Sequence, residues 1–331
     1  MEYIVAKDGR ISIKSGGRML LEDLYPGMDG SEVHPIRVTA TKQRILWELS
    51  EGSICLEIEQ REENRISFRY CLDGWKELPH TFYYFYRART NAEGFYQAAE
   101  GMGGDTGFWT KDKLQSVGTM ISYGLGGLQF QNEENKAMLF YSEDQKQYEN
   151  ICETESFQQL FYTDGWGTRT KRETISCSYG LRTEYIKRSS EEFPVFYIES
   201  AKTMEQGLDH AAQQIGATMK ARLTASPAYH WCSWYYCYHN FDRIQLEEYL
   251  TGLENLEEKP PMRYFQIDAG YFPSAGDWLE NTERFPQGLG EAFARIKKAG
   301  YLPGIWIGPF MVGNRSSLYR RHPDWILHDL D

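Results

Sequence analysis

Carboxylate and aromatic side chains gather in the C-terminal third of the chain, close to the ends of predicted strands. Asp268 closes the apolar run RYFQID, where a buried carboxylate is costly unless it is paired or functional. Asp277 and Trp278 follow in the next loop, and Trp306 lies near the end of the apolar run LPGIWIG. Because a pyranose offers hydroxyl groups at its edge and an apolar C–H face for stacking, these residues indicate a sugar-binding site.

A second aromatic group is the stretch YHWCSWYYCY (229–238), in which six of ten residues carry six-membered aromatic rings. Strand residues alternate between two faces, which sends Trp231 and Trp234 in opposite directions. Each has two interpretations, packing beneath a helix or forming the wall of a sugar site. The core is favoured for Trp231 and the wall for Trp234. Asp277 likewise either caps a turn after Gly276 or binds a ligand.

The charge and hydropathy of the chain exclude several classes of partner. The formal net charge is −11 and no basic face is evident, so we expect no nucleic-acid partner. No window approaches the roughly 18 consecutive apolar residues of a membrane helix, and the N-terminus MEYIVAKDGR has no secretory pattern. We therefore predict a cytoplasmic protein without a membrane partner.

The cysteines give no sign of a metal centre. They are spread along the chain without CxxC spacing or a zinc-type cluster, at Cys55, Cys71, Cys152, Cys177, Cys232 and Cys237. We expect reduced, buried thiols, as is typical of cytoplasmic proteins. Neither a metal nor an organic cofactor is expected.

The first 200 residues consist of short alternating or β-branched runs divided by turn residues such as SGG, SEG and TDG. Nine runs fit half-buried strands: 10–14, 44–49, 54–60, 65–70, 81–87, 137–142, 157–163, 174–180 and 193–200. This pattern predicts a large antiparallel β-sandwich, a supersandwich, over residues 1–202.

At residue 203 the hydrophobic period changes from that of strands to that of a helix. TMEQ, which starts at Thr203, has the form of a capping box and predicts a helix over 203–220. A short linker follows this helix, so the segment 203–227 is expected to connect two domains.

From 228 to 331 the order strand, helix, strand, helix, strand predicts parallel β/α units. Asp242 is expected to cap the first helix and Gly300 to end the second, while Pro323 interrupts a third. A (β/α)8 barrel needs about 250 residues, and this segment holds 104. The sequence therefore predicts the first three units of a TIM barrel with an open sheet edge, as expected of a fragment.

Five motifs in this segment resemble one family in their order and spacing. The barrel start of the family 36 α-galactosidases, melibiase-like members of clan D of the glycoside hydrolases, is similar to HWCSWYYCY, YFQIDAGYFPSAGDWLE, FPQGL, AGYLPGIWIGPFMV and SSLYRRHPDWIL. The resemblance spans about 229–328. It implies a β-sandwich ahead of a TIM barrel, and retaining hydrolysis of terminal α-galactosides in small oligosaccharides such as those of the raffinose type.

The resemblance also implies roles for site residues. A Trp of the first motif, Trp231 or Trp234, and Asp268 would contact the 4- and 6-hydroxyl groups of a terminal galactose. Asp277 and Trp278 match the G-D-W loop of the family. The family usually has a second Asp directly after the first, and this chain has Ala269 there. That departure puts strict selection of galactose in doubt.

Catalysis in this family uses two further Asp residues. The resemblance implies a nucleophile in a K-x-D motif after the fourth barrel strand and an acid/base after the sixth, whereas the chain ends at Asp331. HPDW, which contains Asp324, matches a structural position of the family. We therefore expect no catalytic residue within residues 1–331, and an inactive fragment.

Two alternatives to hydrolysis remain open. A transglycosylase of the raffinose-synthase type would use the same pocket and pass the sugar to another sugar, and Ala269 leaves room for it. The other alternative is a non-catalytic sugar-binding protein made of the sandwich and a partial barrel. Because family members are often oligomeric, the resemblance implies that a full-length form can assemble into homo-oligomers.

Overall fold

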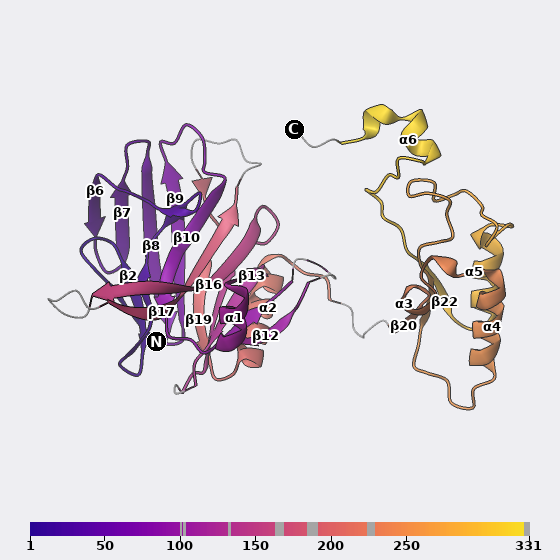
Figure 1. The fold of residues 1–331 in the computed structure, drawn as a ribbon, viewed down its shortest axis with the longest axis horizontal. Helices are drawn as coiled ribbons and strands as arrows, with labels where there is room; N and C mark the ends of the chain where they lie inside the picture. Colours follow the sequence, from indigo (N-terminus) through magenta and orange to yellow (C-terminus); the bar gives the residue numbers. More distant parts are fainter. Residues whose placement is uncertain are drawn as a thin grey trace. The chain divides into compact units, whose positions relative to one another are not determined.

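The structure is a computed structural model that describes residues 1–99, 101, 104–131, 134–162, 169–183, 191–223 and 229–327. It divides into two compact units, Met1–Arg222 and Leu223–Asp331, each with its own core (Figure 1). The boundary lies within the predicted connecting segment 203–227, and most of the predicted linker, residues 224–228, lies outside the described residues.

The first unit contains two large sheets in which the described strands pair in antiparallel fashion. The first sheet runs in the order β1 (Glu2–Val5), β2 (Ile11–Ser15), β3 (Arg18–Leu24), β10 (Thr81–Thr90), β17 (Arg169–Arg182), β16 (Glu149–Tyr162) and β13 (Thr119–Tyr123). A short strand, β4 (Gly27–Met28), pairs with β10 and with β5 (Ser31–Glu32).

The second sheet lies beside the first and carries most of the remaining strands of this unit. Its order is β12 (Gly107–Thr110), β11 (Gly94–Gln97), β14 (Leu125–Gln129), β15 (Ala137–Ser142), β19 (Phe196–Ala201), β9 (Arg65–Asp73), β8 (Ser53–Glu62), β7 (Arg44–Glu48) and β6 (Arg37–Ala40). The two-residue β18 (Glu191–Glu192) pairs with β9. One short helix, α1 (Lys111–Val117), follows β12.

The inner faces of the two sheets share one apolar core. Phe82 and Tyr84 of the first sheet meet Tyr70 and Phe196 of the second, with ring centroids 5.5 Å apart for Tyr70–Phe82 and 4.9 Å apart for Tyr84–Phe196. All nine predicted runs contain strand residues, although Thr163 at the end of one run lies outside the described residues. The predicted antiparallel sandwich is therefore confirmed.

Strand β15 explains why one run of the sandwich is apolar at every position. Met138 and Phe140 belong to the core between the sheets, whereas Leu139 and Tyr141 face a second cluster that includes Met204. Met204 begins helix α2 (Met204–Thr218), which packs against β15 and β19. The helix therefore covers the outer face of this strand, and both faces of β15 are buried.

The start of helix α2 agrees with the sequence. The Thr203 hydroxyl oxygen accepts a hydrogen bond from the backbone N–H of Gln206, as the TMEQ pattern predicts. In the structure this helix belongs to the first compact unit.

Two glycines of α2 differ in the space around them, and this difference gives a stability test. A Cβ at Gly207 would overlap the Leu139 side chain of β15, whereas a Cβ at Gly216 meets only Ala221, at 3.7 Å. Gly207→Ala is expected to lower the free energy of unfolding of the first unit by about 1–3 kcal/mol through overpacking. Gly216→Ala, the matched control, should raise it by about 0.5–1 kcal/mol through helix propensity. Urea unfolding curves check both values, and equal effects of the two variants would contradict the close packing of α2.

The second unit contains three short parallel strands with helices after each. The strands are β20 (His230–Cys232), β21 (Tyr264–Ile267) and β22 (Leu302–Ile305), in that order across the sheet. The helical elements are α3 (Trp234–Cys237), η1 (Tyr238–Asn240), α4 (Arg243–Glu254), α5 (Leu289–Lys298), α6 (Ser317–Arg321) and η2 (Pro323–Trp325). The predicted start of a β/α barrel is confirmed in these three units.

The helix boundaries of this unit follow the predicted signals. Asp242 and Gln245 form a reciprocal capping box at the start of α4. Gly300, with φ of +91°, follows the end of α5, where a left-handed residue is favourable. Helix α6 ends at Arg321, and Pro323 begins η2, so the helix is interrupted at this proline as predicted.

The first predicted strand of this unit is too long. The strand was expected to include YHWCSWY, but β20 ends at Cys232 and the chain turns into helix α3 from Trp234 onward. Ser233 lies between them with helical dihedral angles and is fully buried. Its hydroxyl oxygen accepts a hydrogen bond from the backbone N–H of Asp268, so a contact from another strand ends β20 early.

The predicted state of the cysteines needs one correction. All six carry free thiols, but only Cys152, Cys177 and Cys237 are buried; Cys55, Cys71 and Cys232 are half-buried. The latter three lie at partly exposed positions of strands β8, β9 and β20 and belong to no apolar core cluster. Among the described residues, no helix is long and apolar enough to span a bilayer.

Candidate functional site

The two faces of the parallel sheet have different neighbours. Trp231, Phe265 and Ile267 face helices α4 and α5 and join the apolar core of the unit. Strand alternation places Gln266, Asp268 and Trp306 on the opposite face, near the carboxyl ends of β21 and β22. In β/α barrels the residues at this end of the strands form the ligand site.

Asp268 is held in one orientation by residues of two strands. Its Oδ2 accepts hydrogen bonds from Gln266 Nε2 at 2.9 Å and from the Cys232 thiol at 3.3 Å, and its Oδ1 accepts one from the backbone N–H of Ala269 at 2.7 Å. The residue is only 7% exposed. A carboxylate has about four acceptor positions, so these bonds leave capacity for a ligand hydroxyl group.

Tyr271 connects the loop after β21 to the end of β22. Its hydroxyl donates a hydrogen bond to the Trp306 carbonyl oxygen at 3.2 Å. Burial, together with the nearby Asp268 charge, raises the pKa of Tyr271 to about 12. The phenol therefore stays protonated at neutral pH and remains a donor that fixes the position of Trp306.

Three half-buried rings form an aromatic cluster beside this loop. The Phe272 ring lies 4.6 Å from Trp278 and 6.2 Å from Trp306, and the two Trp rings are 6.1 Å apart (centroid distances). The structure thus brings Trp278 and Trp306 together, and their contact with a sugar stays a prediction. Phe272 was not predicted, although it lies in the same quoted motif.

Asp277 makes its contacts with another part of the unit. Its two carboxylate oxygens accept hydrogen bonds from the backbone N–H groups of Ser317 at 2.9 Å and Leu318 at 3.2 Å, and the residue is 7% exposed. These donors belong to the first turn of α6, where a negative charge is favourable. Asp277 therefore caps this helix and fixes the loop that carries Trp278; direct sugar contact by Asp277 stays a prediction.

The two tryptophans of the first motif occupy different environments. The Trp231 ring stacks on Phe265 at 4.2 Å and contacts Tyr249 at 5.0 Å (centroid distances), on the helix-covered face of the sheet. Trp234 begins α3, and its half-buried ring meets His239 edge-on at 4.8 Å. This placement agrees with the core interpretation of Trp231, and we keep only Trp234 as a proposed sugar contact.

The polar partners of Asp268 were not predicted from the sequence. Cys232 and Gln266 are register partners on β20 and β21, so their contact with Asp268 depends on a register that the sequence does not specify. No group of three or more His, Cys, Asp or Glu side chains suited to a metal ion occurs in the described part of the chain.

Three parallel strands, each followed by helices, with a fixed carboxylate and aromatic rings at their carboxyl ends, are typical of the start of a β/α barrel. Residues 202–331 match the family model Melibiase. The α-galactosidase AgaA of Geobacillus stearothermophilus is 31% identical over 103 residues, which is 29% of this chain and 14% of that protein. α-Galactosidase C of Emericella nidulans is 34% identical over 119 residues, covering 29% of this chain and 15% of its own length.

Solved structures extend the likeness to the fold of the sandwich. The α-galactosidase TtGalA of Thermus thermophilus, in complex with p-nitrophenyl α-D-galactopyranoside, aligns over 87% of this chain and 53% of its own, with a TM-score of 0.51 and 18% identity. The family 36 AgaA structure aligns over 94% of this chain and 49% of its own, with a TM-score of 0.52 and 14% identity. The chain thus spans about half the length of these solved relatives.

Together these matches confirm the resemblance that the five motifs indicate. Residues 202–331 resemble the α-galactosidases of the Melibiase family in sequence, and the fold of the chain is similar to that of family 36 α-galactosidases.

Proposed function

We propose that the protein is an α-galactosidase-like retaining glycoside hydrolase that acts on terminal α-galactosides of small oligosaccharides. The observation that carries the proposal is Asp268, a carboxylate fixed at the carboxyl end of the parallel sheet, on the face opposite helices α4 and α5. The relatives support the ligand class, because TtGalA structures contain p-nitrophenyl α-D-galactopyranoside in one case and stachyose in another.

In this proposal the described residues bind and orient the sugar. Asp268 accepts hydrogen bonds from hydroxyl groups of a terminal galactose, and its own partners keep the carboxylate from rotating away. Trp234, Trp278 and Trp306 offer apolar ring surface to the C–H face of the sugar. Asp277 supports the loop that holds Trp278.

Bond cleavage with retention uses a carboxylate nucleophile and a second carboxylic acid that first donates a proton and then activates water. We assign neither role to a residue of this chain. The proposal further places the protein in the cytoplasm, acting on a soluble sugar without a nucleic-acid or membrane partner, with homo-oligomers as its expected assembly.

Calorimetric titration of the purified chain with galactose, raffinose and glucose tests the sugar-binding part of the proposal. Galactose and raffinose should bind, and glucose should bind about 10- to 100-fold more weakly. Inverting the 4-hydroxyl group would leave a charged acceptor without its donor, which costs about 1.5–3 kcal/mol. Equal binding of galactose and glucose would contradict a role of Asp268 in galactose recognition, and no binding of either would contradict a sugar site on this chain.

A further inference from the structure

Two cysteines face each other directly across neighbouring strands of the sandwich, far along the chain from the proposed sugar site. Cys55 of β8 and Cys71 of β9 are register partners, and both are half-buried. Their strand neighbours Ile54 and Leu72 are fully buried in the core. Because side chains alternate along a strand, the two thiols therefore lie together on the outer face of the sheet.

We propose that Cys55 and Cys71 form a redox modification site, a dithiol that a small charged disulfide such as oxidised glutathione converts into a cross-strand disulfide. The backbone geometry permits this bond. Opposed Cα atoms in antiparallel pairs are about 4.5 or 5.5 Å apart, and disulfides span Cα distances of about 4.4–6.8 Å. Rotation about the two Cα–Cβ bonds is then enough to join the sulfur atoms.

The neighbours of the two sulfur atoms give them different roles. Arg44 of β7 donates a hydrogen bond from Nε to the Cys55 sulfur at 3.4 Å, and this contact raises the pKa of Arg44. The thiolate is the attacking species in thiol–disulfide exchange. Burial raises the pKa of the Cys71 thiol, and the Cys55 sulfur and the Glu192 carboxylate raise it further. Cys55 is therefore the attacking residue and Cys71 the resolving one.

The reaction has two exchange steps. The Cys55 thiolate attacks one sulfur of the small disulfide, whose S–S bond breaks and releases one thiolate that takes up a proton. Cys71 then loses its proton and attacks the Cys55 sulfur of the mixed disulfide, which releases the second small thiol. Two protein thiols are oxidised by two electrons in total, and one small disulfide is reduced to two thiols.

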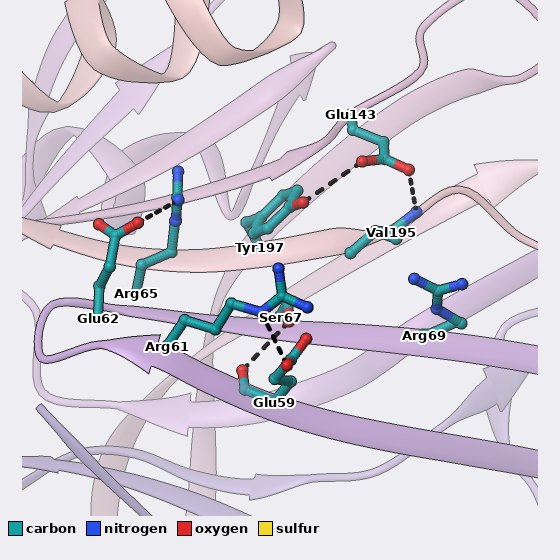
Figure 2. A pocket seen from close by; sticks show the side chains of 9 residues that line it. All are labelled: Glu59, Arg61, Glu62, Arg65, Ser67, Arg69, Glu143, Val195 and Tyr197. Carbon is teal, nitrogen blue, oxygen red and sulfur yellow. Dashed lines mark hydrogen bonds and ion pairs between the residues drawn. The ribbon is translucent and has the colours of Figure 1, made fainter. Parts of the chain in front are cut away.

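A polar groove on the same outer face favours a charged reactant. Figure 2 shows the groove, a cavity of about 190 Å³ lined by residues that include Arg61, Glu143 and Tyr197. Arg69 lies at its edge, two residues before Cys71 on the same face of β9. The guanidinium groups of Arg61 and Arg69 are exposed, with partners in Glu59 and Glu192 respectively. The carboxylate groups of glutathione disulfide can bind Arg61 and Arg69 in place of Glu59 and Glu192, and its ammonium groups can bind the two released glutamates.

The test treats the folded chain with oxidised glutathione, blocks remaining thiols with N-ethylmaleimide and maps disulfides by mass spectrometry of unreduced peptides. We expect a Cys55–Cys71 disulfide as the first product. Cys71→Ser should stop the reaction at a persistent glutathione adduct on Cys55, and Cys55→Ser should abolish both adduct and cross-link. Arg44→Gln should slow formation of the disulfide several-fold without changing the product.

The chain offers two controls for this test. Cys152 and Cys177 have sulfur atoms 3.7 Å apart but are buried, so they should stay reduced if accessibility is required as well as proximity. Cys232 is half-buried and is opposed by Gln266 rather than by a cysteine. Cys232→Ser should therefore leave the rate of Cys55–Cys71 disulfide formation unchanged. The proposal is overturned if Cys55 and Cys71 remain fully alkylated, if the adduct on Cys55 persists in the wild-type chain, or if Cys152–Cys177 forms first.

Discussion

Replacing Asp268 with Asn is expected to weaken galactose binding by about 10- to 100-fold, because the sugar loses a hydrogen bond to a charged acceptor worth about 1.5–3 kcal/mol. The amide keeps one acceptor oxygen for the backbone N–H of Ala269. Its NH2 group, however, would face the Gln266 and Cys232 donors that now bind Oδ2. The variant therefore removes the charge and the two hydrogen bonds to Oδ2 with little change in volume, and its folding must be checked beside its affinity.

Calorimetric titration with galactose measures this effect, and Asp324→Asn serves as the matched control. Asp324 is an exposed carboxylate in η2, so the same chemical change there should leave galactose affinity unaltered. Hydrogen exchange of peptides from β20 and β21 shows whether the second unit keeps its stability in both variants. Unchanged affinity in a folded Asp268→Asn variant would remove Asp268 from the proposed site.

Much of the sandwich could be predicted because alternation along a strand is a local property. Strand β9 shows this well, since its even-numbered residues from Ile66 to Leu72 are buried and its odd-numbered residues face outward. Other elements lacked such a signal. Strand β14 has the sequence LGGLQ, where two glycines replace the side chains that would reveal its period.

The length predicted for the first strand of the second unit, β20, was wrong for a non-local reason. YHWCSWY reads as one strand, and nothing in the stretch itself marks Ser233 as its end. The strand ends there because the Ser233 hydroxyl accepts a hydrogen bond from the backbone of Asp268, 35 residues away in the sequence. A contact of that kind depends on the register between parallel strands, which periodicity does not specify.

The candidate site could be predicted only in part for the same reason. Asp268, Trp278 and Trp306 stood out by type and by their position near strand ends. The sequence did not identify the hydrogen-bond partners of Asp277, because the amide groups that it caps lie 40 and 41 residues further along the chain. Local turn chemistry suggested a cap, and the structure places that cap on a distant helix.

Trp231→Ala and Trp234→Ala are expected to separate stability from binding. Trp231 stacks on Phe265 and contacts Tyr249 in the core, so its removal should lower the free energy of unfolding of the second unit by about 3 kcal/mol. Trp234 lies at the start of α3 beside His239, and its removal should change that free energy by less than about 1 kcal/mol.

The effects on sugar affinity should follow the opposite order. Loss of the Trp234 ring should weaken galactose binding by about 3- to 10-fold, since ring contacts of this kind contribute about 0.5–1.5 kcal/mol. Trp231→Phe retains an aromatic ring in the core and should restore most of the stability that Trp231→Ala loses, with galactose affinity close to that of the wild type. Hydrogen exchange of peptides spanning β20 and β21 measures the first effect and calorimetry the second. Weaker binding in a fully stable Trp231→Phe variant, together with normal binding in Trp234→Ala, would exchange the roles of the two rings and place the sugar on the helix-covered face of the sheet.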